Sequence, residues 1–526
     1  MKELNDHYDF IIVGSGFGGS VSALRLSEKG YKVLVIEKGK KFNTEDFPKT
    51  NWNVKKWLWI PALRFFGFFK ITFYKHVGIL SGVGFGGGSL VYANTLPIPK
   101  KEFFESVSWS HLNNWEEELL PFYQIARKML GVEKNPRLEF GELSLQKLAK
   151  QNNQEEKFEP TEVAVYFGEP NKNIPDPFFN GEGPERSGCT FCGGCMVGCR
   201  FNAKNTLDKN YLYLAGKQGA DFLTEAEVSD VIPILANNKN AYKIKWKSSV
   251  KFFKKSGEFT CDGVVFAGGV LGTIPLLLKL KNSSLPNLSN KVGKNIRTNS
   301  ESLLGVTSTN KKNDFSKGIA IGSIYHTDKF SHIETVRYPS GSGFWRTQLM
   351  PMLDGKNFAI RFLKILVEII IHPINWLKVY FVRDWAKQTQ ILLFMQTLNS
   401  TLSFKQGLFR MKTKLEEGTA PTAFIPEARK LVKDYSKIVG GLPVALASET
   451  ILGIPTTAHI LGGSVMGIDS TEGVIDKNNK IFGYDNLFIC DGSAISANPG
   501  VNPSLTITAL SERAMSKIPQ KKVIPN

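Results

Sequence analysis

The chain opens with an apolar segment that has the pattern of a buried strand. Residues 8–39 start with "Y-D-F-I-I-V", continue through glycines into a helical spacing at Val21 and Leu24, and end with a second apolar run at residues 33–36. Short apolar runs between turn residues predict buried strands, whereas apolar residues three or four positions apart predict a helix. The N-terminus is therefore expected to form a strand–helix–strand unit.

Two later segments repeat part of this pattern. Residues 262–278, "D-G-V-V-F-A-G-G-V-L-G-T-I-P-L-L-L", predict a strand, a glycine turn and the start of a helix, and residues 485–496 predict another buried strand. We expect the first of these segments to return to the N-terminal sheet. The alternation in residues 242–247, "Y-K-I-K-W-K", predicts a strand with one solvated face.

An apolar segment at residues 358–382 raises the question of membrane contact. It is interrupted by charged residues and by Pro373, and a spanning helix needs about 20 nearly uninterrupted apolar residues, so we expect no membrane span. Two interpretations stay open: a buried helix pair divided at Pro373, or an interfacial helix that lies on a membrane surface. The aromatic stretch 57–70, which has basic flanks, raises the same question.

Length, charge and cysteine use narrow the class of protein. The 526 residues carry a formal net charge of +18 and six cysteines, and a chain of this length is expected to form two or more lobes. Basic charge can serve nucleic acid or an anionic membrane, but the sequence contains no nucleic-acid-binding module, and we expect no such partner. The few cysteines form no secreted disulfide framework, and the first strand begins too early for a signal peptide. The expected location is the cytoplasm, with membrane association left open.

The glycines after the first strand carry the first chemical signal. Gly14, Gly16 and Gly19 form G-x-G-x-x-G between the predicted strand and helix, and Glu37 ends the second strand. Gly14 permits a tight turn, Gly16 lets the backbone approach a pyrophosphate, and Gly19 lets the helix pack on the strand. Glu37 would accept hydrogen bonds from the adenosine ribose hydroxyls, which argues against a 2′-phosphate. The sequence thus predicts a dinucleotide site, although this fingerprint alone does not distinguish FAD from NAD.

A second glycine-rich loop and three C-terminal motifs carry a further signal. The loop, "S-G-V-G-F-G-G-G-S-L-V-Y-A-N" at residues 81–94, includes Gly82, Gly86, Gly87 and Ser89. The C-terminal block contains "H-I-L-G-G-S-V-M-G", "N-L-F-I-C-D-G-S" and "G-V-N-P-S-L-T-I-T-A-L-S-E-R". These segments resemble the glucose–methanol–choline (GMC) oxidoreductases, which are FAD enzymes, and among them the bacterial cholesterol oxidases. The resemblance covers the first 100 residues, the 260s and 270s and the last 70 well, and it is weak between them.

The resemblance implies FAD as the cofactor and places several residues around it. Asp491 and Gly492 would lie near the ribityl–pyrophosphate, and the backbone near Val228 would meet the adenine. One position departs from the pattern, because the cholesterol oxidases have asparagine where Tyr92 stands, beside the isoalloxazine ring. This difference puts the reactivity with oxygen in question.

Three residues are the candidate catalytic groups. Alcohol oxidation by a flavin needs a base for the O–H proton and a path for hydride transfer. His459 and Asn502 match the family's His–Asn pair, and Glu334, in "H-I-E-T-V-R-Y-P-S-G-S-G", matches a glutamate of the cholesterol oxidases. The resemblance implies that Glu334 or His459 takes the hydroxyl proton, that Asn502 and His459 hold the oxygen, and that the hydride passes to FAD.

Four of the six cysteines stand in one short run. Cys189, Cys192, Cys195 and Cys199 lie in "C-T-F-C-G-G-C-M-V-G-C". This spacing is typical of iron–sulfur ligands, so we expect an iron–sulfur cluster first. A zinc site and a set of buried thiols in a glycine-rich turn stay open as alternatives. A cluster here would lie near the flavin and could pass electrons to an acceptor protein or a quinone.

These segments together predict an α/β fold with a discontinuous Rossmann-like FAD-binding domain and an α+β substrate domain that has a mainly antiparallel sheet. The FAD-binding domain is expected at residues 1–100, 181–305 and 445–526, and the substrate domain at residues 101–180 and 306–444.

The expected function is oxidation of a CH–OH group of a small hydrophobic alcohol, sterol-like or other. Two alternatives stay open. One is a dehydrogenase that passes electrons through the cysteine cluster to an acceptor other than oxygen, and the other is a flavin-binding protein that holds lipid without turnover.

Overall fold

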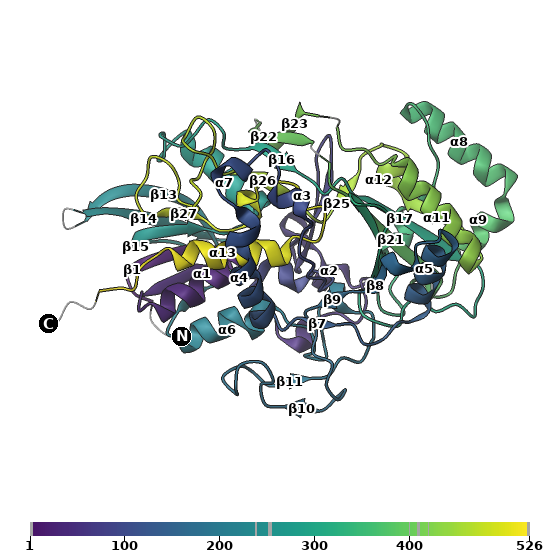
Figure 1. The fold of residues 1–526 in the computed structure, drawn as a ribbon, viewed down its shortest axis with the longest axis horizontal. Coiled ribbons are helices and arrows are strands. Elements are labelled where there is room, and N and C mark those ends of the chain that lie inside the picture. Colours follow the sequence, from purple (N-terminus) through teal and green to yellow (C-terminus); the bar gives the residue numbers. More distant parts are fainter. Residues whose placement is uncertain are drawn as a thin grey trace.

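A mixed seven-stranded sheet forms one side of the molecule (Figure 1). The computed structural model describes residues 4–236, 239–250, 255–398, 400–407, 411–418 and 420–522. The strands follow the order β12-β2-β1-β15-β14-β13, and β27 also pairs with β15. Their bounds are β1 (His7–Val13), β2 (Val33–Ile36), β12 (Asp221–Leu223), β13 (Ala226–Ala236), β14 (Lys239–Ser248), β15 (Ser256–Phe266) and β27 (Leu487–Ile489).

The N-terminal strand–helix–strand prediction is confirmed. Helix α1 (Phe17–Glu28) connects β1 to β2, and the two strands pair in parallel. The predicted later segments join the same sheet: β15 pairs in parallel with β1 on one side and β27 on the other, and α7 (Val270–Lys281) follows β15. All four residues of β2 are buried, as expected for a parallel strand that is covered on both faces. This arrangement is Rossmann-like.

The second sheet is antiparallel throughout, as predicted for the substrate domain. Its strands follow the order β20-β24-β17-β21-β19-β18-β8. Their bounds are β8 (Phe158–Pro160), β17 (Ser302–Ser308), β18 (Ile321–His326), β19 (Ser331–Val336), β20 (Leu349–Pro351), β21 (Thr389–Gln396) and β24 (Gly441–Leu446).

Helices α5 (Phe140–Gln151) and α11 (Pro426–Val439) cover one face of the antiparallel sheet. Along β21, Leu392 and Phe394 pack into the core beneath these helices, while Ile391 and Leu393 point to the opposite face and line a cavity. Successive side chains of a strand alternate between faces, so one strand builds both the core and the cavity wall. The expected domain boundaries stay a prediction, and residues 1–3 and 523–526 of the expected FAD-binding domain lie outside the described residues.

The apolar segment 358–382 forms two helices, α8 (Phe358–Ile371) and α9 (Pro373–Tyr380), and the predicted division at Pro373 is confirmed. The helices are mostly exposed, so the interpretation as a buried pair is wrong. The stretch 57–70 behaves differently, because Trp57, Trp59 and Phe68 are buried in an aromatic cluster. In the described part of the chain, each helix is too short or too polar to cross a membrane.

Candidate active site

The first glycine turn has the shape that a dinucleotide requires. Gly14 adopts a φ of +104°, and a Cβ at this position would lie 2.5 Å from the carbonyl oxygen of Ala267. A Cβ on Gly19 would lie 2.1 Å from the carbonyl oxygen of Gly14, so α1 can pack closely on the strand only because residue 19 is glycine. A Cβ on Gly16 would meet its nearest protein atom only at 3.9 Å. The space beside Gly16 is therefore open, and it belongs to the cavity described below.

Glu37 lies at the end of β2 and closes this turn. Its carboxylate accepts hydrogen bonds from the Ser15 backbone N–H at 3.0 Å, the Ser15 hydroxyl at 2.7 Å and the Gly39 backbone N–H at 2.7 Å. Burial raises the pKa of Glu37 above its ordinary value, although these donors act in the opposite direction. Glu37 also lines the cavity, where a ribose hydroxyl could approach it.

The second glycine loop packs directly against the first. A Cβ on Gly87 would lie 2.6 Å from Cα of Gly16, so the two loops could not approach each other with larger residues. Ser89 donates a hydrogen bond to the Gly86 carbonyl at 2.7 Å and accepts one from the Leu207 N–H at 3.1 Å. Gly82 and Gly87 line the cavity, whereas Gly86 and Ser89 shape the loop behind it.

Asp491 and Gly492 follow β27 and reach the cavity from the C-terminal segment. Asp491 accepts hydrogen bonds from the Gly269 N–H at 2.8 Å and the Thr273 hydroxyl at 2.5 Å, and burial raises its pKa. It thereby fixes the turn between β15 and α7. Val228, on β13, also lines the cavity.

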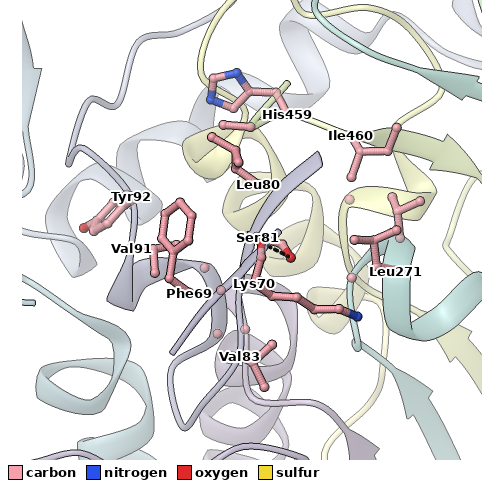
Figure 2. A pocket seen from close by; sticks show the side chains of 18 of the residues that line it. Phe69, Lys70, Leu80, Ser81, Val83, Val91, Tyr92, Leu271, His459 and Ile460 are labelled. Carbon is pink, nitrogen blue, oxygen red and sulfur yellow. Dashed lines mark hydrogen bonds between the residues drawn. The ribbon is translucent and has the colours of Figure 1, made fainter. Parts of the chain in front are cut away.

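One cavity of about 680 Å³ connects these groups with the antiparallel sheet. Its walls run from Gly14 and Glu37 to His459 and Asn502, and on to apolar side chains of the second sheet that include Ile391 and Leu393. Figure 2 shows part of the lining, with His459 at the top. The site therefore lies between the two sheets.

His459 is held by a buried glutamate. Its Nδ1 lies 2.8 Å from Oε1 of Glu301, whose side chain is fully buried. The Thr457 hydroxyl donates to Glu301 at 2.7 Å and the Ala458 N–H at 3.0 Å, so the carboxylate is fixed on both oxygens. Burial alone would lower the pKa of His459, but the negative charge and the hydrogen bond of Glu301 raise it above its ordinary value. The same contacts overcome the effect of burial on Glu301 and lower its pKa.

Asn502 and Glu334 come together on the other side of the site. The Asn502 amide lies 3.5 Å from Oε2 of Glu334, which is fully buried. Asn502 lines the cavity, whereas Glu334 lies behind it and is absent from the lining among the described residues. His332 Nε2 lies 3.5 Å from Oε1 of Glu334, two positions away on the same face of β19. Oδ1 of Asn502 is buried and has no hydrogen-bond partner within the described protein, which suits an atom that faces a ligand.

Tyr92 lines the cavity, at the position where the resemblance implied asparagine. Its hydroxyl donates a hydrogen bond to the Asn205 carbonyl at 2.7 Å, and burial raises its pKa far above the ordinary value. The ring stacks edge-on against Phe17, and Nζ of Lys204 lies 4.8 Å from its centre. Tyr92 is therefore a fixed, neutral wall of the site.

The cysteine run does not form a metal site in this structure. Within the described ranges, no group of three or more His, Cys, Asp or Glu side chains is placed to hold a metal ion. Cys189, Cys195 and Cys199 pack instead in an apolar cluster. Burial raises the pKa of Cys195 to about 11, whereas for Cys199 burial is outweighed by the positive charge of Lys209 and by backbone hydrogen bonds, which lower its pKa. Cys189 is buried and the other three cysteines of the run are half-buried, and the iron–sulfur, zinc and buried-thiol interpretations all stay predictions.

Two residues of the site escaped the sequence reasoning. Glu301 stands in "N-S-E-S", which carries no motif, and only the fold brings it to His459. His332 precedes Glu334 by two positions in "H-I-E", and this alternation was a usable signal, because both side chains then share one face of a strand.

Comparison with known proteins agrees with the fold. Family models of the GMC oxidoreductases match residues 174–300 and 428–511, and a model of the NAD(P)-binding Rossmann-like domain matches residues 12–51. A cholesterol oxidase of Acinetobacter baumannii is 42% identical over 99% of this chain and 96% of its own length. A cholesterol oxidase of Mycobacterium tuberculosis is 40% identical over 98% of this chain and 91% of its own length. The solved structure of pyridoxine 4-oxidase from Mesorbium loti shares the fold, with a TM-score of 0.62 at 16% identity over 97% of this chain and 98% of its own.

A Rossmann-like sheet joined to an antiparallel sheet, with a dinucleotide cavity between them, is the architecture of a flavin-dependent oxidoreductase. The chain belongs to the GMC oxidoreductase family, is cholesterol oxidase-like, and acts on CH–OH groups with FAD as its cofactor. The open space beside Gly16 and the facing glycine loops fit the pyrophosphate of FAD. The resemblance seen in the sequence is thereby confirmed.

Proposed function

We propose that this enzyme oxidises the hydroxyl group of a hydrophobic, sterol-like alcohol. The observation that carries the proposal is the apolar wall of the cavity beyond His459 and Asn502, contributed by the antiparallel sheet and by two tryptophans, Trp345 and Trp385. A small polar alcohol would leave this wall exposed to water, whereas a sterol would cover it. The names of the two relatives that are 40% and 42% identical agree with this class of substrate.

We assign the chemistry to residues at the edge of this wall. Bound FAD supplies the hydride acceptor. Because Nδ1 of His459 is held by Glu301, Nε2 is the nitrogen that accepts the proton of the substrate hydroxyl. Asn502 donates one amide N–H to Glu334, which orients the side chain from behind, and the second N–H of the same group holds the substrate oxygen. Glu334 therefore acts through Asn502, since it does not line the cavity.

A titration with different alcohols tests the substrate class. We expect cholesterol in detergent to bleach the flavin band of the anaerobic holoenzyme, and glucose or choline to leave it unchanged. Rapid bleaching by a small polar alcohol and none by cholesterol would contradict the proposal. Admission of oxygen to the reduced enzyme then identifies the acceptor: peroxide formation marks an oxidase, and its absence together with turnover on an artificial acceptor marks a dehydrogenase.

Replacing Glu301 by glutamine is expected to shift the pH dependence of flavin reduction. A base acts in its neutral form, so the rate of the wild type should fall as the pH drops through the raised pKa of His459. Removal of the negative charge lowers that pKa, and the acidic limb should move to lower pH by about one unit or more. Rates of flavin reduction between pH 5 and pH 9 measure this shift.

Glu512→Gln is the matched control for Glu301→Gln. Glu512 is a second buried carboxylate, which accepts a hydrogen bond from Nε of Arg25 at 2.7 Å and lies outside the cavity lining. In the control variant, the rate of flavin reduction should fall at the same acidic pH as in the wild type. If the rate in Glu301→Gln also fell at the same acidic pH as in the wild type, the role of Glu301 in setting the pKa of His459 would be refuted.

The two alternative functions have weaker support. An electron route through the cysteines needs a metal site, and no such arrangement exists in the described residues. A lipid binder without turnover does not explain why His459 is held by a buried carboxylate at the cavity wall.

A further inference from the structure

The helices α8 and α9 form a hairpin that extends from the molecule at the right of Figure 1. Most of its large apolar side chains are exposed, which is unusual for a helix whose mean composition is so apolar. Five of them are exposed by more than 60%: Leu363, Ile370, Ile371, Ile374 and Phe381. Contiguous apolar surface of this kind marks a contact with a protein or a membrane.

The charges around this surface favour a lipid. Within residues 354–383, all of which are described, the exposed basic side chains are Lys356, Lys364, Lys378 and Arg383. The one exposed acidic side chain in this range is Asp354, which pairs with Arg429 at 2.6 Å. The acidic Glu368 is half-buried and accepts a hydrogen bond from Trp376 Nε1 at 3.3 Å, so it points into the hairpin. Basic side chains beside an apolar helix face complement the anionic headgroups of a bilayer.

Two other ways of covering this apolar surface, a membrane span and a dimer of the chain, fit less well. Helix α8 has 14 residues, about 21 Å at 1.5 Å per residue, whereas the hydrocarbon core is about 30 Å thick, so the helix does not span. Two copies packed through this surface would place two predominantly basic rims at one interface, and like charges repel each other there.

We propose that the α8–α9 hairpin docks on the surface of a lipid bilayer that contains anionic lipids. The apolar side chains enter the boundary between headgroups and acyl chains, and the four basic side chains bind the headgroups.

The buried side of helix α9 packs close to the cavity. Trp376 and Val379, the buried residues of α9, pack in the same apolar cluster as Trp345, Leu349 and Trp385. These last three line the cavity. A docked enzyme would therefore present the apolar end of its cavity to the membrane, and a hydrophobic alcohol could enter without crossing water. This step, unlike the docking itself, rests on the proposed function.

Co-sedimentation of the holoenzyme with vesicles tests the docking. The probes are phosphatidylcholine vesicles with and without about 30% phosphatidylserine. We expect the wild type to bind the anionic vesicles, and the triple variant Ile370→Ser, Ile371→Ser, Ile374→Ser to bind them at least about tenfold more weakly. The pair Lys364→Gln, Lys378→Gln should lose about tenfold on anionic vesicles and keep the affinity of the wild type for neutral ones.

Matched substitutions control for the loss of exposed apolar area. Val107, Leu235 and Ile468 are exposed by 82%, 78% and 72% and lie outside the hairpin, so replacing all three by serine should leave vesicle binding unchanged. Equal binding by the hairpin triple variant and the wild type would overturn the proposal. The proposal would also be overturned, in favour of self-association, if the wild type did not bind vesicles but formed a dimer and the hairpin triple variant did not dimerise.

Activity separates the docking from the proposed substrate. On cholesterol carried in anionic vesicles, the hairpin triple variant should turn over at least about tenfold more slowly than the wild type, and on cholesterol in detergent both should react equally. Equal rates on vesicles would contradict transfer from the membrane. Failure of the wild type to oxidise cholesterol in detergent would instead contradict the proposed function, and the vesicle-binding result would stand by itself.

Discussion

Replacement of His459 by glutamine should leave FAD bound but slow flavin reduction by the alcohol about 100-fold to 10,000-fold. The side chain lines the cavity, and Glu301 fixes its ring through Nδ1 at 2.8 Å. Glutamine can still form a hydrogen bond to a substrate oxygen, but it cannot accept the hydroxyl proton at neutral pH. The loss should therefore appear in the rate of reduction at saturating alcohol more than in the apparent affinity. Stopped-flow measurement of flavin bleaching without oxygen gives both quantities.

A second histidine variant controls for general damage to the protein. His76 is partly buried and bonded to Thr413 at 2.8 Å, and it lies outside the cavity lining. His76→Gln should reduce its flavin at the rate of the wild type. Full FAD content with an unchanged reduction rate in His459→Gln would show that another group takes the proton, and Glu334 would be the next residue to test.

The sequence predicted the nucleotide-binding half of the fold well, because its signals are local. Apolar runs of strand length and the glycines between them sufficed for β1, α1 and β2, and Gly14, Gly16 and Gly19 lie where these elements meet. Glycine at such positions follows from backbone geometry, so one sequence can reveal it. The return of β15 to the same sheet also followed from its apolar pattern, whereas for β27 the sequence indicated a buried strand and the structure supplied its place beside β15.

The surroundings of the candidate catalytic residues could be predicted from the sequence only in part. His459 and Asn502 stand in recognisable segments, but the partner of His459 is a glutamate 158 positions away. No local pattern marks Glu301, since its role arises only when β17 and the segment before β26 (Leu461–Gly463) are brought together. The match of Glu334 did identify a residue near the site, although the fold places it behind Asn502 rather than in the cavity wall.

Two segments left more than one interpretation open for a common physical reason. The apolar segment 358–382 and the cysteine run both have a composition that fits more than one environment. A helix that is apolar on all sides is usually buried, yet α8 is exposed. Thiols at iron–sulfur spacing can bind a cluster, yet here they pack against Val163, Val165 and Ala203. Sequence spacing alone does not say which surface covers a side chain.

Replacement of Gly16 by alanine should lower the affinity for FAD by about tenfold or more without destabilising the apoprotein. The φ of −70° at Gly16 is accessible to alanine, and the nearest protein atom would lie 3.9 Å from the new Cβ. The methyl group would instead occupy the cavity where the backbone must approach the pyrophosphate. Fluorescence titration of the apoprotein with FAD measures the affinity, and thermal unfolding of the apoprotein measures the stability.

Gly14→Ala provides the contrast that isolates the ligand effect. Its φ of +104° is unfavourable for alanine, and the Cβ would lie 2.5 Å from the backbone of Ala267, so this variant should destabilise the apoprotein itself by about 1–3 kcal/mol. Substitution of these two nearby glycines would thus have different effects: Gly14→Ala would lower the stability of the fold, and Gly16→Ala would lower the affinity for FAD. An FAD affinity equal to that of the wild type in Gly16→Ala would show that the pyrophosphate does not pass over this turn, and the position of FAD in the cavity would have to be revised.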